Sequence, residues 1–185
     1  MKKLFSLVFF SLLTLGLFAQ SPSYVDFEWD ILRFGYAASS ADAVSGGFSF
    51  GGEVRYNATD RFSIGIGGDA YVFGTDFDDD ADIEASSSSM LFGDYYLTGD
   101  SPQRAFFGLG IGMISTGTIT IRNGNFEDTI DGETGLGLAP RGGYEFGHVR
   151  LQGVFNIALK EEQSNYFGIS VALTLWGGYK GMDSN

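Results

Sequence analysis

The chain has 185 residues, a formal net charge of -12 and no cysteine. The lack of cysteine excludes disulfide bonds and a lipid anchor on an N-terminal cysteine. The negative charge argues against nucleic-acid binding, which depends on lysine and arginine neutralising phosphates. This length suits one domain, and its 28 glycines disfavour helices.

The N-terminus is typical of a secretory signal peptide. Lys2 and Lys3 supply the positive region, residues 4–18 are almost entirely apolar, and Ala19 precedes the expected cleavage point. The alternative is an uncleaved anchor, but an apolar run of about fifteen residues is short for a spanning helix, which needs about twenty. We therefore predict a signal peptide over residues 1–19 and one domain over residues 20–185.

Eight stretches follow in which apolar side chains tend to alternate with glycine, serine or charge, as in strands with one apolar and one polar face. They cover residues 25–37, 46–56, 62–73, 85–97, 105–122, 133–146, 148–159 and 166–179. The serine run makes 85–97 the weakest of them. In the first stretch the apolar parity changes between Ile31 and Leu32, and a β-bulge near residues 31–33 would restore a single apolar face.

The connectors between these stretches alternate in length, although the contrast is modest. The short ones are 57–61, 98–104 and 147, and the longer ones are 38–45, 74–84, 123–132 and 160–165. Short periplasmic turns and longer extracellular loops are usual in outer-membrane barrels. In such a barrel this pattern would place both termini in the periplasm.

No predicted helix could cover the apolar faces of eight such strands. A closed barrel with its apolar face turned to lipid solves this problem, and strands of about ten to fourteen residues suit a tilted crossing of the bilayer. The predicted fold class is all-β, an eight-stranded antiparallel up-and-down transmembrane β-barrel. The expected location is the bacterial cell outer membrane.

Aromatic residues are expected to form girdles at both rims of the barrel. The periplasmic rim would hold Tyr56, Phe62, Tyr95, Phe107, Tyr144, Phe146 and Trp176, and the other rim Phe48, Val72 with Phe73, and Tyr166 with Phe167. The alternative is that aromatic residues simply favour strands.

Two segments carry a family resemblance. They are the run from Ala139 to Leu151, with sequence APRGGYEFGHVRL, and the run from Asn165 to Val171, with sequence NYFGISV. Through them the chain resembles the small outer-membrane β-barrel family of Bacteroidetes-type bacteria, related in architecture to OmpA-like and OmpX-like eight-stranded domains. The resemblance implies the barrel fold over the whole mature chain but no particular activity. Barrels of this kind often end on an aromatic residue, whereas here six residues follow Tyr179.

The polar parity carries charged residues that an eight-stranded barrel would enclose. These are Glu53, Arg55, Asp69, Arg141, Glu145 and Arg150. Eight strands leave room for side chains but not for a wide channel, and buried charges need partners. We predict a structural ion cluster that fills the lumen, with a gated ion path as the alternative.

Two further features of the sequence are candidate sites. The acidic segment Asp76–Glu84 could bind calcium, but its spacing is not that of an EF-hand and a solvated loop is the simpler interpretation. His148 could serve a lipid-modifying barrel enzyme beside Glu145 or a serine, yet nothing in the sequence places them together. We expect no enzyme activity, no catalytic residue, no cofactor and no metal site.

The favoured function is a structural or surface-interaction role in the outer membrane. The expected partners are outer-membrane lipid, lipopolysaccharide and the barrel-assembly machinery, with no nucleic acid and an unidentified extracellular loop partner. The alternatives are a soluble periplasmic lipid-binding barrel, a narrow channel and a lipid-modifying barrel enzyme. In the soluble barrel the apolar parity would point inward.

Overall fold

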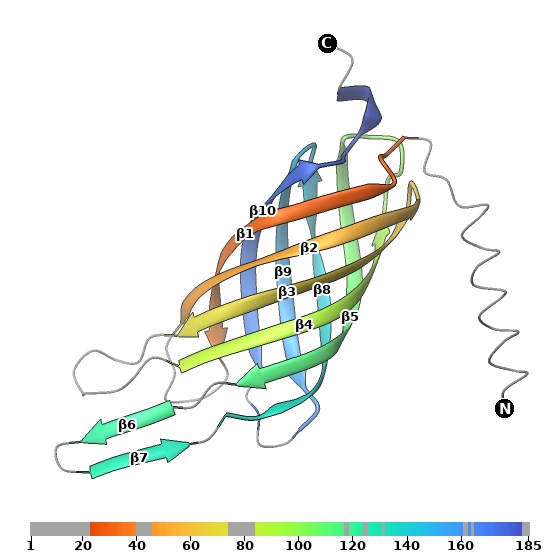
Figure 1. Ribbon diagram of the computed structural model, residues 1–185. Coiled ribbons are helices and arrows are strands. Elements are labelled where there is room, and N and C mark those ends of the chain that lie inside the picture. The colour runs from red at the N-terminus through yellow and green to blue at the C-terminus, as the bar shows by residue number, and fades with distance from the viewer. Residues whose placement is uncertain are drawn as a thin grey trace, which may run out of the picture.

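The computed structural model describes residues 23–39, 46–73, 84–116, 119–123, 126–130, 132–160, 163 and 165–182. Eight strands close into a barrel in the order β1-β10-β9-β8-β5-β4-β3-β2 (Figure 1). They are β1 (Phe27–Ser39), β2 (Gly47–Thr59), β3 (Phe62–Phe73), β4 (Glu84–Tyr96), β5 (Gln103–Thr116), β8 (Thr134–Phe146), β9 (Val149–Ala158) and β10 (Tyr166–Trp176). All barrel pairs are antiparallel and successive barrel strands are neighbours, which confirms the predicted fold class. The expected signal peptide lies outside the described residues.

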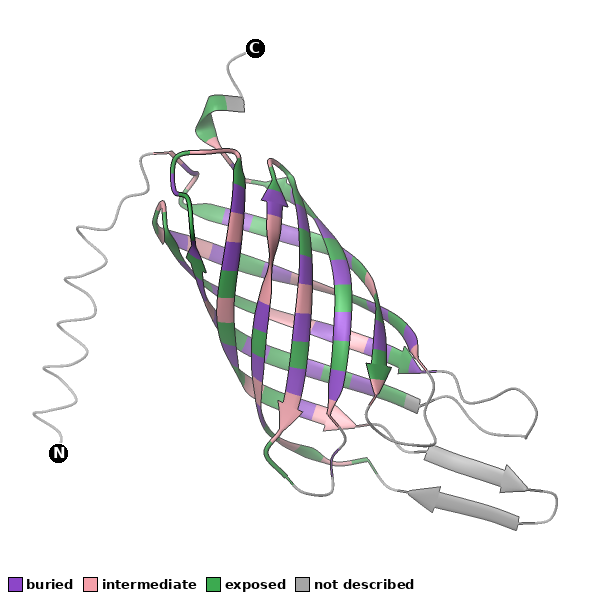
Figure 2. Ribbon diagram, turned by 180° about the vertical axis from the view of Figure 1, so that it is seen from behind, coloured by how far each residue is buried: buried purple, intermediate pink, exposed green. Residues whose placement is uncertain are grey.

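Buried and exposed residues alternate along the barrel strands, as Figure 2 shows. In β10 the outward positions from Phe167 to Leu175 carry only large apolar side chains, and the inward positions between them carry glycine, serine, alanine and threonine. This placement of apolar residues is the reverse of that in a water-soluble protein, in which apolar residues are buried. No helix in the described ranges is long and apolar enough to cross a membrane.

A β-bulge interrupts β1 where the sequence predicted one. The pairing of β1 shifts between Asp30 and Leu32 on the β10 side and between Asp30 and Arg33 on the β2 side. Ile31 and Leu32 are therefore both exposed, while Asp30 and Arg33 on either side of them are both buried. The extra residue restores one apolar outer face despite the change of parity in the sequence.

The two ends of the barrel differ in their connectors. We call the end with connectors 60–61, 97–102 and 147–148 the turn end, and the opposite end the loop end. The β8–β9 turn is tight because Gly147 adopts a φ of 63°, in the left-handed region that favours glycine. The chain enters β1 and leaves β10 at the turn end, so both terminal segments join the barrel at the same end, as the alternation of connector lengths predicted.

The predicted fifth strand, residues 105–122, was wrong beyond residue 116. The barrel strand β5 ends at Thr116, and β6 (Ile119–Asn123) pairs with β7 (Phe126–Ile130) as a separate two-stranded sheet (Figure 1). The sequence between these two strands is Gly124-Asn125, a two-residue pair typical of hairpin turns.

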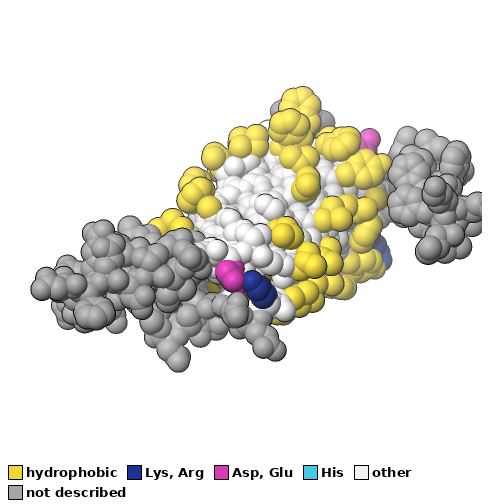
Figure 3. All heavy atoms as spheres, turned by 60° about the horizontal axis from the view of Figure 1, so that its bottom comes forward, with side chains coloured by type: hydrophobic (Ala, Val, Ile, Leu, Met, Phe, Trp, Pro, Cys, Tyr) yellow, Lys and Arg dark blue, Asp and Glu magenta, His cyan; other side chains and the backbone are white. Residues whose placement is uncertain are grey.

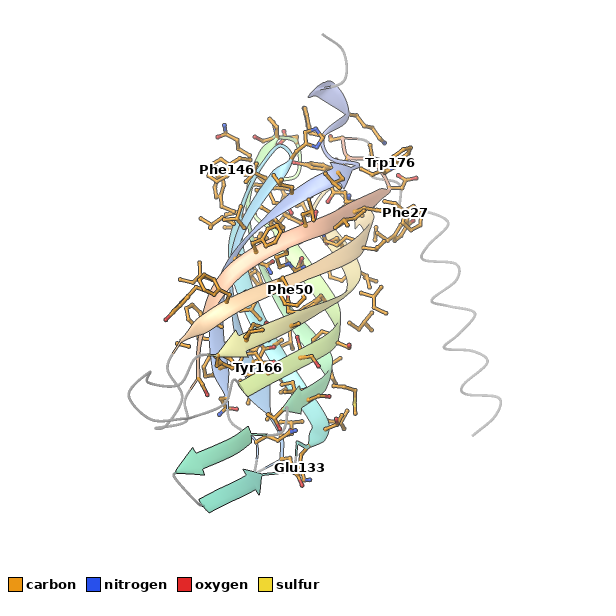
Figure 4. The ribbon with its side chains drawn as sticks, turned by 60° about the vertical axis from the view of Figure 1, so that its left-hand side comes forward. Phe27, Phe50, Glu133, Phe146, Tyr166 and Trp176 are labelled. Carbon is orange, nitrogen blue, oxygen red and sulfur yellow. The ribbon has the colours of Figure 1, made fainter. Side chains whose placement is uncertain are left out.

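Large apolar side chains spread over the outer wall, as Figure 3 shows with the loop end turned forward. At the turn end Phe27, Phe146 and Trp176 are exposed (Figure 4). At the loop end the predicted girdle needs correction, because Phe73 and Tyr166 are buried in the interior. Neighbours along a strand face opposite sides, so only one residue of each adjacent pair can reach the outer surface.

Candidate functional site: the charged interior

Among the residues that the structure describes, eleven charged side chains lie inside the barrel, each no more than 8% exposed. This interior ion network comprises Glu28, Asp30, Arg33, Glu53, Arg55, Asp69, Asp94, Arg104, Arg141, Glu145 and Arg150. It has five guanidinium groups and six carboxylates. Because buried ions are costly without partners, the contacts among these groups decide whether the interior is stable.

Glu145 is the centre of the turn-side half of the network. Its carboxylate lies 2.6 Å from Nε of Arg104 and 2.7 Å from Nη1 of Arg150, and it also pairs with Arg55. The hydroxyl of Tyr96 donates a hydrogen bond to the same carboxylate at 3.1 Å. Three guanidiniums from three different strands therefore converge on one carboxylate.

Two acids of β1 complete this turn-side group. Arg55 Nη2 lies 2.9 Å from Glu28 and 3.1 Å from Asp30, and Arg104 Nη2 lies 3.5 Å from Glu28. The hydroxyl of Thr174 on β10 donates to Asp30 at 2.6 Å. The turn-side group thus has three carboxylates (Glu28, Asp30, Glu145) and three arginines (Arg55, Arg104, Arg150).

The middle group lies between the turn-side group and the loop end. Arg141 contacts Glu53 at 2.6 Å and Asp94 at 2.7 Å. Arg33, which follows the bulge, contacts Glu53 at 2.8 Å and Asp69 at 2.9 Å. This group has three carboxylates and two arginines.

One contact joins the two groups into a continuous network. Nη2 of Arg150 in the turn-side group lies 2.7 Å from Asp94 in the middle group. With Thr174 included, side chains from all eight barrel strands take part in the network. All of its cations are arginines, whose planar guanidiniums can bridge several carboxylates at once.

The six residues predicted for the interior cluster are all buried and all belong to this network. Sequence reasoning missed Glu28, Asp30, Arg33, Asp94 and Arg104, which the structure also places there. The alternation in the sequence could have identified Glu28 and Asp30 as inward residues, because they alternate with outward aromatic residues. Arg33 was obscured by the bulge, and Arg104 by its placement in a predicted connector.

Aromatic rings cover three of the guanidiniums. The guanidinium carbon of Arg104 lies 3.5 Å from the ring centroids of both Tyr24 and Tyr96. Arg141 and Arg150 contact phenylalanine rings at 3.6 and 3.7 Å. Such cation–π contacts are strongest where water is excluded, so the rings supplement the ion pairs.

The segment before β1 closes the turn end. Tyr24 is buried above Arg104, and its hydroxyl donates to the carbonyl of Ser101 at 2.5 Å. Burial raises the pKa of this phenol, so the hydroxyl remains protonated and can donate. Tyr24 also bridges to Tyr179, and Val25 donates to the carbonyl of Gly178 at 3.0 Å. Both terminal segments therefore cover the turn-end mouth together.

The loop end of the interior is packed differently. The rings of Tyr71, Phe73 and Tyr166 pack against one another, with centroids 4.5 to 6.2 Å apart, and belong to one buried apolar cluster. The hydroxyl of Tyr71 accepts a hydrogen bond from Asn156 at 3.3 Å. We call this packing the loop-side aromatic cluster.

A cavity of about 10 Å³ separates the aromatic cluster from the middle group. Its lining residues are Ser49, Asp69, Tyr71, Gln152, Val154, Gly168 and Ser170. This volume is about what one water molecule needs, and hydroxyl and carboxylate groups dominate the lining.

The remaining sequence candidates do not form a site among the described residues. His148 is exposed in the β8–β9 turn, whereas the Glu145 carboxylate is buried among arginines, so the structure does not bring them together. Of the acidic segment, residues 76–83 lie outside the described residues.

Comparison with solved structures supports the fold. Neisserial surface protein A, a bacterial outer-membrane β-barrel, matches with a TM-score of 0.57 and 14% identity, covering 82% of this chain and 97% of that chain. The N-terminal β-barrel domain of OprF from Pseudomonas aeruginosa gives 0.48, with 16% identity and coverage of 84% and 100%. Ail of Yersinia pestis, solved with the heparin analogue sucrose octasulfate, gives 0.49, with 13% identity and coverage of 84% and 99%.

No family model and no curated protein matches the sequence. At such low identities the structural likeness establishes the architecture alone. The chain thus has the fold of the small eight-stranded outer-membrane barrels.

Proposed function

We propose that this protein is an outer-membrane β-barrel with a structural or surface-interaction role and a lumen filled by side chains. One observation carries the proposal: the outer wall is apolar while the interior holds a charged network. Phe48 and Ile66, for example, are 76% and 68% exposed, whereas Arg104 and Arg150 are fully buried. Lipid is the solvent that suits such an outer wall.

The same observation argues against a soluble periplasmic lipid carrier. Such a barrel would need an apolar interior to hold its ligand, and eleven charged groups fill the interior here. The outward aromatic and aliphatic side chains would also face water at a large cost in free energy. The bacterial outer-membrane location of Neisserial surface protein A supports the membrane proposal through the fold.

The interior contacts favour a closed barrel over a narrow channel. The ion network, the Tyr24 closure at one end and the aromatic cluster at the other each occupy the bore. We expect no conductance steps in planar bilayers, and regular steps would favour the channel. A lipid-modifying enzyme has less support, because the described residues do not bring Glu145 and the exposed His148 together. Unchanged lipid A after His148→Ala would remove that alternative.

The surface-interaction part of the proposal rests on the loop end. Three loop-end connectors carry two or more acids each, among them Asp78–Asp80, Asp128 and Glu161. We propose that these loops face outward and meet lipopolysaccharide or a cationic surface partner, and that the barrel-assembly machinery inserts the chain after a secretion signal is removed. Membership of the Bacteroidetes-type family is likewise a proposal, resting on residues 139–151 and 165–171.

Membrane fractionation with heat-modifiability tests the location. The full chain is expressed with its N-terminal segment, inner and outer membranes are separated, and boiled and unboiled samples are compared on a gel. We expect outer-membrane protein whose mobility depends on boiling, because a closed barrel resists detergent. Soluble periplasmic protein with a single mobility would contradict the proposal.

A further inference from the structure

The interior ion network has an excess of one carboxylate, and the excess lies in its middle group. The turn-side group balances three carboxylates with three guanidiniums, while the middle group sets three carboxylates against two. A buried charge without compensation is costly in a low-dielectric interior. Either a proton on one carboxylate or a bound cation must therefore offset this charge.

Asp69 is the carboxylate of the middle group with the fewest partners. Glu53 and Asp94 each contact two guanidiniums. Asp69 contacts only Arg33, and a single nitrogen, Nη1, donates to its two oxygens at 3.0 and 2.9 Å. Both Asp69 oxygens can accept further bonds, since an ionised carboxylate has about four acceptor positions.

The small cavity beside Asp69 is built from oxygen-bearing side chains. Ser49, Tyr71 and Ser170 line it with Asp69, and each of these residues is at least nine-tenths buried. The cavity of about 10 Å³ admits one particle of the size of water.

We propose that this cavity binds one monovalent cation, sodium or potassium, through the Asp69 carboxylate and the hydroxyl oxygens of Ser49, Tyr71 and Ser170. Hard cations prefer such oxygen ligands. A divalent ion would overcompensate the single excess charge, and no cluster of three or more potential metal ligands of the His, Cys, Asp and Glu type occurs among the described residues. The inference goes beyond the proposed function, because it depends only on the interior of the closed barrel.

Unfolding in different cations tests the site. The full chain is folded in detergent micelles, and its urea midpoint is measured in sodium, potassium or N-methylglucamine chloride at equal ionic strength. We expect a higher midpoint in sodium or potassium, rising with the logarithm of the concentration of that ion, because a ligand of the folded state stabilises it. N-methylglucamine is too large for the cavity.

Two variants and a control locate the ion. Asp69→Asn removes the excess charge and should abolish the cation dependence without lowering the midpoint in N-methylglucamine. Gly168→Ala should also abolish it by filling the cavity, and it fits because its nearest contact would be Tyr71 Cε1 at 3.6 Å. Glu133→Gln, at an exposed ion pair with Lys160, should keep the full dependence.

Equal midpoints in all three salts would overturn the proposal and leave a water molecule or a proton at Asp69. A cation dependence that survives Asp69→Asn would place the ion elsewhere and overturn it equally. Heat-modifiable mobility of each variant reports separately that the barrel is folded. A soluble chain without that mobility change would contradict the proposed function. The cation proposal is decided separately, by the dependence of the urea midpoint on the cation.

Discussion

The turn end and the loop end of the interior are filled by opposite chemistry. Towards the turn end, guanidiniums and carboxylates from different strands bridge the bore, as in the pair of Arg141 on β8 and Glu53 on β2. Towards the loop end, three aromatic rings fill the bore without a formal charge. The first arrangement fixes which strands face one another, because each guanidinium requires particular partners, whereas the second mainly fills volume.

The largest expected effect comes from breaking the charged half. Arg141→Met would leave Glu53 with one guanidinium and Asp94 with one, both still buried. Removing one partner of a buried ion pair costs about 3–5 kcal/mol, and we expect a loss of that size in the free energy of unfolding. This loss is measured by urea titration in lipid vesicles, with tryptophan fluorescence as the readout.

The matched control is Arg61→Met. Arg61 is exposed in the β2–β3 turn, and exposed substitutions usually change stability by less than about 0.5 kcal/mol. If both variants lost the same free energy, the network would not be the source of the effect.

The closure of the turn end should contribute less. Tyr24→Ala removes the ring over Arg104 and the bond to Ser101. A cation–π contact shielded from water contributes about 2 kcal/mol and a hydrogen bond about 1 kcal/mol, so we expect a loss of about 2–3 kcal/mol on urea titration. Tyr24→Phe keeps the ring and should retain most of the stability; a loss as large as that of the alanine variant would assign the effect to the hydroxyl.

The smallest expected effect lies in the aromatic half. Phe73→Leu preserves an apolar side chain of similar size but removes ring contacts with Tyr71 and Tyr166. A swap that nearly conserves volume costs about 1 kcal/mol. Phe48→Leu, at the exposed outer face of the same end, should be nearly neutral. A reversed order of these two variants would contradict the inward placement of Phe73.

The eight strands and the bulge were predictable because the sequence repeats one rule. Alternation between an apolar outer and a polar inner position is a local property, and the change of parity at Ile31 and Leu32 left room only for an extra residue. The same rule would have found Glu28 and Asp94. It failed at Phe73 and Tyr166, where large apolar side chains occupy inward positions.

Which charged side chains pair inside the barrel could not be predicted from the sequence. Glu53 and Arg141 are 88 residues apart, and their contact depends on the stagger of strands around the closed barrel, which local patterns do not encode. The cavity at Asp69 depends on the same stagger. The end of β5 was missed because residues 119–122 continue the strand pattern in the sequence, although in the structure they belong to β6, which pairs with β7 outside the barrel.

The alternation of lipid contact along β10 tests the central claim most directly. The chain has no cysteine, so single cysteines at Ile169, Val171, Ser170 and Thr174 each provide one labelling position. In vesicles, a fluorophore at Ile169→Cys or Val171→Cys should be quenched by brominated acyl chains, while Ser170→Cys and Thr174→Cys should resist labelling in the folded state. Quenching at the inward positions, or none at the outward ones, would contradict a barrel with an apolar outer face and a charged interior.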